Sequence, residues 1–81
     1  MNPETHPLLN QELYARAESA AMAAFEVHRD DRPHERMRRM DRAAMTVFRK
    51  AGTEADIRKL FAMSITADIL EREVHSRRHA R

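Results

Sequence analysis

Apolar residues recur at intervals of three and four through most of the chain, which places side chains on one face of an α-helix. Two breaks divide this pattern, and the spacing predicts helices at about 11–28, 33–51 and 53–78. Pro33 fits the first turn of a helix, and Gly52 suits the left-handed end of one. The pattern therefore predicts an all-α protein, a three-helix bundle with a long C-terminal helix.

The segment 1–9 contains two prolines and several polar residues, so we expect a flexible N-terminal arm before a single helical domain at 10–81. Asn10, Asp31 and Thr53 are the expected N-caps of the three helices, because short polar side chains accept hydrogen bonds from a first turn. The short connection between the first two helices predicts that they lie antiparallel.

The predicted third helix carries two apolar stripes, with polar residues between them. One stripe contains Leu60, Met63, Ala67, Leu70 and Val74, and the other contains Phe61, Ile65 and Ile69. A three-helix domain of this size has little surface to cover both, so we expect one stripe to pack inside the chain and the other to form a helical dimer. We assign the dimer interface to Phe61, Ile65 and Ile69.

Six methionines in so short a chain are typical of adaptable apolar surfaces. Met37, Met40 and Met63 fall on the predicted apolar stripes, so we expect them in the core. Met22 and Met45 fall outside the main stripes. We therefore predict that Met22 and Met45 contribute to the interface with a partner.

Composition narrows the classes of function. With 81 residues the chain forms one domain at most, and so small a core often depends on a partner for stability. The absence of cysteine excludes disulfides and thiolate–zinc sites, and a single glycine excludes a glycine-rich phosphate loop. No segment has the apolar length of a signal peptide or a membrane span. We therefore expect a cytoplasmic protein that has no membrane association.

Arg38, Arg42 and Arg49 line up on the second helix opposite its apolar stripe. Charged residues make up 35% of the chain while the net charge is only +2, so this row is a local excess. Such a basic patch can contact the phosphate backbone of nucleic acid, or an acidic protein surface. A helix-turn-helix is disfavoured, because the turn is short and two acids open the next helix, where phosphates would lie.

Glu71, His75 and His79 follow one another at four-residue intervals and can face one side of the third helix. Two histidines one turn apart can bind a metal ion, but no third firm ligand is evident. We therefore expect a solvated helix end and no metal or cofactor. Asp68 lies between the apolar stripes, and we expect it to pair with Arg72, or with an arginine across an interface, rather than to act as a catalytic acid.

No side-chain set typical of an enzyme occurs, neither a Ser/His/Asp arrangement nor a cysteine nucleophile. We interpret the chain as a small non-enzymatic helical interaction protein, a regulatory or accessory protein that forms a homodimer and binds a protein partner. The alternative is a small nucleic-acid-binding regulator that uses the basic face of the second helix.

Overall fold

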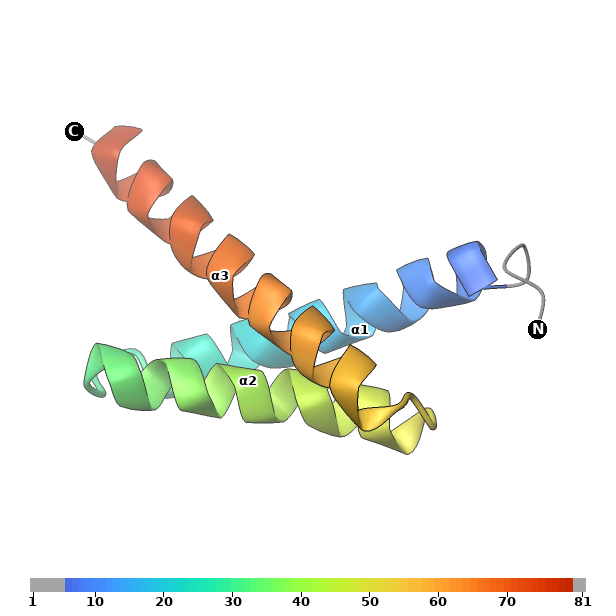
Figure 1. The fold of residues 1–81 in the computed structure, drawn as a ribbon. Helices are drawn as coiled ribbons and strands as arrows, with labels where there is room; N and C mark the ends of the chain where they lie inside the picture. The colour runs from blue at the N-terminus through green and yellow to red at the C-terminus, as the bar shows by residue number, and fades with distance from the viewer. Residues whose placement is uncertain (1–5, 80–81) are drawn as a thin grey trace.

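The computed structural model describes the backbone of residues 6–79 and the side chains of residues 11–76. Within that range the chain is all-helical, and its three helices pack together (Figure 1). Helix α1 spans His6–Val27, α2 spans Pro33–Lys50 and α3 spans Ala55–His79. The predicted all-α bundle of three helices, of which the last is the longest, is confirmed.

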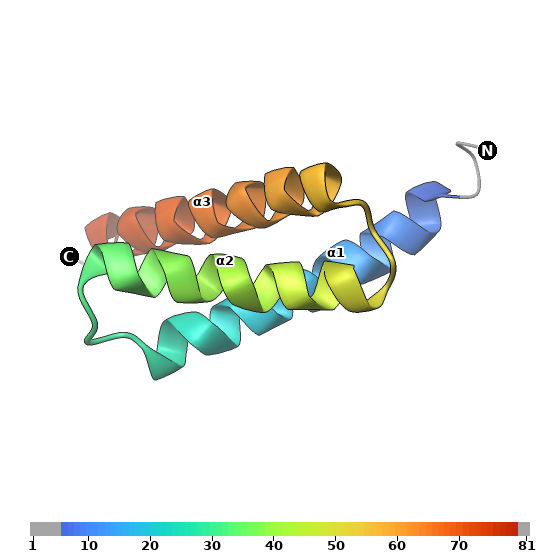
Figure 2. The ribbon, with the colours of Figure 1, turned by 60° about the horizontal axis from the view of Figure 1, so that its bottom comes forward.

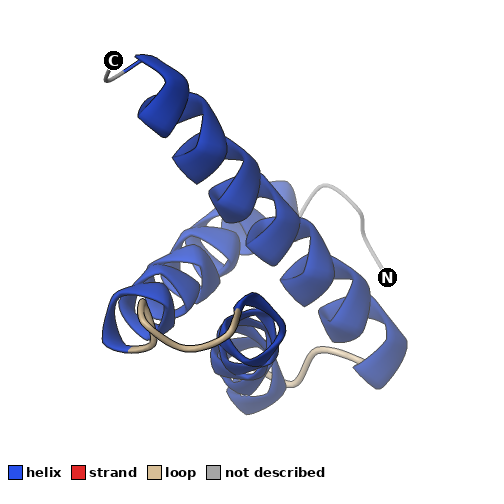
Figure 3. Cartoon of the chain, turned by 90° about the vertical axis from the view of Figure 1, so that its left-hand side faces the viewer, coloured by secondary structure: helices blue, strands red, loops and turns tan. Residues whose placement is uncertain are grey.

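The first two helices lie side by side and antiparallel, as predicted, and α3 crosses over the pair (Figures 1 and 2). The C-terminal part of α3 projects away from α1 and α2 (Figure 3). Among the described residues, the side of α3 that faces away from α1 and α2 has no helix packed against it.

Helix α1 begins at His6, several residues before its predicted start, so it extends into the segment predicted as a flexible arm. Asn10 lies inside the helix, and its prediction as an N-cap is wrong. The reason is Pro7, which is tolerated in the first turn of a helix, where an N–H group has no helical acceptor. Residues 1–5 of the predicted arm lie outside the described part of the chain.

The N-cap of α2 is Arg32 rather than the predicted Asp31, and the Arg32 side chain makes no capping hydrogen bond. Pro33 opens the helix as predicted. The carboxylate of Asp31 instead lies 2.9 Å from Nδ1 of His28, which joins the connection to the end of α1.

The turn before α3 depends on Gly52, whose φ of 85° is the left-handed conformation predicted for it. Helix α3 then starts two residues later than predicted. Thr53 is not its N-cap, since the carbonyl of Glu54 accepts the first hydrogen bond of the helix from the N–H of Arg58. Thr53 serves through its backbone instead: its N–H donates to the carbonyl of Phe48, and its carbonyl accepts from the Arg58 guanidinium at 3.0 Å.

The core lies where the three helices meet. Its buried apolar residues are Ala17, Ala21, Phe25, Met40, Ala44, Phe48, Ala62, Ile65 and Ile69. Alanines on α1 and α2 let these helices approach closely, so larger side chains supply most of the buried area. Three rings, those of Tyr14, Phe48 and Phe61, join the helices with centroids 5.5–6.4 Å apart in edge and tilted contacts.

Thr66 is the buried polar side chain of this core among the described residues. Its hydroxyl donates a hydrogen bond to the carboxylate of Asp41 on α2. Because a buried hydroxyl needs a partner, this bond fixes which side of α3 turns toward α2.

Candidate functional site

The inner face of α3 consists of Phe61, Ile65 and Ile69, the stripe predicted as the dimer interface. Ile65 is fully buried and Ile69 is 3% exposed, both inside the core of one chain. Phe61 is half-buried against the rings of Tyr14 and Phe48. Ile65 and Ile69 therefore have no surface left for a second chain in this fold, which corrects their assignment to a dimer. The physical reason is that α1 and α2 already cover them.

The outer stripe of α3 is the other one, formed by Leu60, Met63, Ala67, Leu70 and Val74. Leu60 is 66% exposed, Met63 is 51% exposed and Val74 is 55% exposed, while Ala67 is exposed and Leu70 half-buried. Its spacing of three, four, three and four residues is the heptad pattern of helices that pack along one another. Most of the side chains in this stripe are therefore exposed to solvent on the outer side of α3.

The methionine predictions divide in the same way. Met40 is fully buried, as predicted, but the expected burial of Met37 and Met63 is wrong, since Met37 is exposed on α2 and Met63 on the outer stripe. Met22 is exposed on α1, and Met45 is half-buried against the core.

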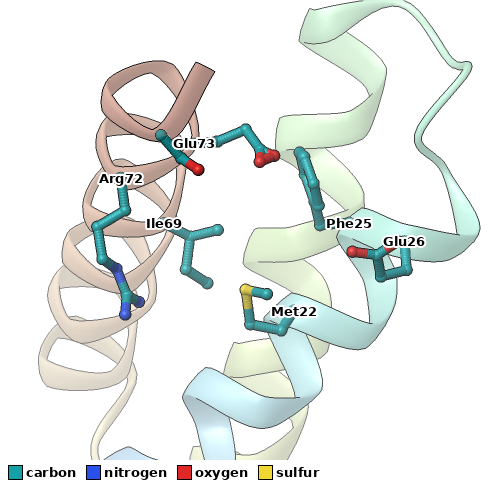
Figure 4. A pocket seen from close by; sticks show the side chains of 7 residues that line it. Met22, Phe25, Glu26, Ile69, Arg72 and Glu73 are labelled. Carbon is teal, nitrogen blue, oxygen red and sulfur yellow. The ribbon is translucent and has the colours of Figure 1, made fainter. Parts of the chain in front are cut away.

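Met22 lines a groove of about 220 Å³ where α1 and α3 diverge (Figure 4). The apolar side chains in it are Met22, Phe25 and Ile69, and the polar ones are Glu26, Arg72, Glu73 and Ser76. In Figure 4 the Ile69 side chain reaches from α3 toward Met22 on α1. Met45 lies elsewhere, beside Arg42 and Arg49, so the structure does not bring the two predicted interface methionines together.

Arg72, which lines this groove, takes part in an ion-pair network. Arg72 lies 3.7 Å from Asp68, its predicted partner one turn earlier, and 2.6 Å from Glu18 on α1. Asp68 is exposed, so it is not a buried acid. Arg72 therefore links α1 to α3, a contact that the spacing within α3 does not reveal.

The basic patch predicted at Arg38, Arg42 and Arg49 is exposed on α2. Among the described residues, none forms an ion pair with these three guanidinium groups. Arg36, in the same stretch, is not part of the patch, because it lies over the Phe25 ring at 5.3 Å from the centroid.

Arg58 on α3 lies beside this patch, although it is not among the residues predicted from the sequence to form it. It lines a hollow of about 360 Å³ together with Arg42, Met45, Thr46 and Arg49. Residues on different helices meet here because the connection 51–54 is short. The short connection is the sequence signal that predicts the start of α3 close to the end of α2.

The structure describes only part of the weak metal-candidate set. Glu71 and His75 are exposed on α3, and the His79 side chain lies outside the described residues. The described part of the chain contains no group of three or more potential ligands within reach of one metal ion.

At the end of α1, hydrogen bonds to the Glu26 carboxylate raise the pKa of the Arg29 guanidinium. Arg29 is therefore a cation at neutral pH.

Comparison with protein-family models, with curated proteins and with solved structures gives no match. Within the described chain, no helix combines the length and the apolar character that crossing a membrane requires. Three surfaces are the candidates for a functional role: the outer stripe of α3, the groove around Met22 and the basic patch of α2.

Proposed function

We propose that this chain is a small non-enzymatic helical interaction protein that forms a homodimer through the outer stripe of α3 and binds a protein partner. The observation that carries the proposal is the exposure of Leu60, Met63 and Val74 along a helix whose opposite face is already packed. A helix that is apolar on two sides needs two partners, and one chain supplies only the first.

The exposed stripe is long enough for a helix–helix contact. From Ile57, which is also exposed, to Val74 it extends about 25 Å at 1.5 Å per residue. Monomeric proteins rarely leave large contiguous apolar patches in water. Full burial of a side chain such as Leu60 or Met63 is worth about 1.5–3 kcal/mol, which gives association its driving force.

A second copy of the same chain fits the stripe when the two α3 helices run antiparallel. Leu60 then meets Leu70 of the partner subunit, and the large Met63 meets the small Ala67 of the partner subunit. Lys59 lies beside one end of the stripe and Glu71 beside the other, so the antiparallel arrangement places opposite charges at the same end of the contact. Charges that flank a heptad seam set the orientation of paired helices, and these favour the antiparallel one.

The test is the mass of the protein in solution. Leu60→Asp places a charge within the contact, opposite Leu70 of the partner subunit, and is expected to convert a dimer to a monomer with unchanged helix content. Sedimentation equilibrium across micromolar concentrations measures the mass, and circular dichroism measures the helix content. Val27→Asp is the matched control, because Val27 is 77% exposed at the far end of α1 and outside the stripe.

Two results contradict the proposal. One is a wild-type chain that remains monomeric at the highest concentration measured, and the other is equal dissociation by Val27→Asp.

The orientation of the two helices is tested separately by disulfide crosslinking, which is possible because the chain has no cysteine of its own. Mixed Leu60→Cys and Leu70→Cys chains are expected to crosslink to each other, whereas a parallel dimer would crosslink Leu60→Cys to itself.

The groove around Met22 supports the second half of the proposal, the protein partner. Its apolar floor and charged rim suit one apolar side chain of a partner surrounded by polar contacts, and methionine adapts readily to such a side chain. Met22→Glu is expected to abolish capture of a partner from cell lysate that Val27→Glu retains. Equal capture by both variants would remove the groove from the proposal.

A further inference from the structure

The basic face of the molecule consists of Arg38, Arg39, Arg42 and Arg49 on α2 and Arg58 on α3. The acids nearest in sequence do little to neutralise it: Glu35 borders it at one end, while Asp41 accepts the hydrogen bond from Thr66. The segment 32–50 contains seven basic residues and two acidic ones. The face therefore carries a net positive charge that the fold leaves for an external anion.

The guanidinium groups form two adjoining clusters that share Arg42. The first surrounds a hollow of about 100 Å³ that is lined by Glu35, Arg38, Arg39 and Arg42. The second is the hollow of about 360 Å³ between Arg42, Arg49 and Arg58. Arg42 and Arg49 are seven residues apart, which is about 10 Å along a helix.

The side chains around these clusters indicate which kind of polyanion fits. All four aromatic residues, Tyr14, Phe25, Phe48 and Phe61, lie in the core or against it, so none is available to stack on an unpaired base. Helix α2 contains no asparagine or glutamine that would read an adenine edge. The face suits a regular array of phosphates better than exposed bases.

We propose that this basic face binds the phosphate backbone of duplex DNA, with α2 lying over the major groove and Arg42 and Arg49 contacting the two flanking strands. The major groove of B-form DNA is about 12 Å wide, close to the rise along α2 from Arg42 to Arg49, whereas the major groove of A-form RNA is too narrow. Arg58 completes the second cluster, so binding needs α3 as well as α2. The contact is independent of the outer stripe and of dimer formation.

Fluorescence anisotropy with a labelled duplex of arbitrary sequence tests the inference. Four phosphate contacts give a slope of about −3.6 in log affinity against log salt, or a loss of about 100-fold between about 50 and about 200 mM salt. Arg49→Gln and Arg58→Gln are each expected to weaken binding several-fold and to reduce the slope by about 1.

Arg16→Gln is the matched control, since Arg16 is an exposed arginine on α1 outside the basic face. It is expected to leave affinity and slope unchanged, and thermal melting of each variant confirms that all of them are folded. Four results overturn the inference: no duplex binding at the lowest salt, an equal loss with Arg16→Gln, equal affinity for single strands or duplex RNA, or equal affinity for polyglutamate. The last of these would assign the face to an acidic protein surface.

Discussion

The two faces of α3 are both rich in apolar residues, yet they meet different environments. On the inner face Ile65 and Ile69 are buried against α1 and α2, whereas on the outer face Leu60 and Met63 are mostly in water. Apolar character alone therefore does not decide which side chains are buried. The contacts between helices do, above all the bond from Thr66 to Asp41 and the aromatic rings around Phe61.

This contrast separates two properties of one helix. The inner face contributes to the stability of the folded chain, and the outer face is available for association. Substitutions on the two faces are therefore expected to change different measured quantities.

The largest expected effect is on the inner face. Ile65→Ala removes buried methyl and methylene groups from a packed site and is expected to lower the free energy of unfolding by about 2–5 kcal/mol. Since a chain of this size has a total stability of about 4–12 kcal/mol, the loss is a large fraction of it. Urea denaturation measures it. A loss below about 1 kcal/mol would mean that Ile65 is not in the core.

An intermediate effect is expected from Thr66→Val, which keeps the shape of the side chain but removes its hydroxyl. The half-buried carboxylate of Asp41 then lacks its donor, and the free energy of unfolding is expected to fall by about 1–3 kcal/mol. Thr46→Val is the control, because the Thr46 hydroxyl bonds only to the carbonyl of Arg42 on its own helix. Equal losses of stability in the two variants would show that the hydrogen bond from Thr66 to Asp41 does not orient α3.

The smallest effect on stability is expected on the outer face. Leu60→Ala is expected to change the free energy of unfolding of the monomer by less than about 0.5 kcal/mol, because Leu60 is mostly in water already. Denaturation at a protein concentration below the dissociation constant of the proposed dimer measures this value. A loss comparable to that of Ile65→Ala would show that the two faces are equivalent after all.

The sequence predicts the helices and the turn at Gly52 because both depend on local spacing and on backbone freedom. The pairing of Asp68 with Arg72 is predictable for the same reason, because the two residues lie one turn apart on one helix. The sequence also predicts two apolar stripes on the last helix. It does not predict which one faces inward, because that choice depends on Asp41 and on other residues of distant segments.

The same limit explains the candidate sites. Arg38, Arg42 and Arg49 share one helix, so their alignment follows from periodicity, whereas Arg58 joins them across a turn. The separation of Met22 from Met45 depends on the angle at which α3 crosses, which no local pattern encodes. The start of α1 differs for another reason, since prolines are compatible both with an arm and with a first helical turn.

Both connections between the helices are short, at 28–32 and 51–54, and this has a consequence for the rate of folding. Helices joined in this way make mostly local contacts, and helical proteins of that kind fold in about microseconds to milliseconds. Refolding at two protein concentrations is expected to give a fast phase that is independent of concentration and a later one that depends on it; a single phase would contradict this. In the proposed dimer, chain connectivity sets the order of events on α3: its inner face is covered first, within one molecule, and its outer face later, at a rate set by how often two molecules meet.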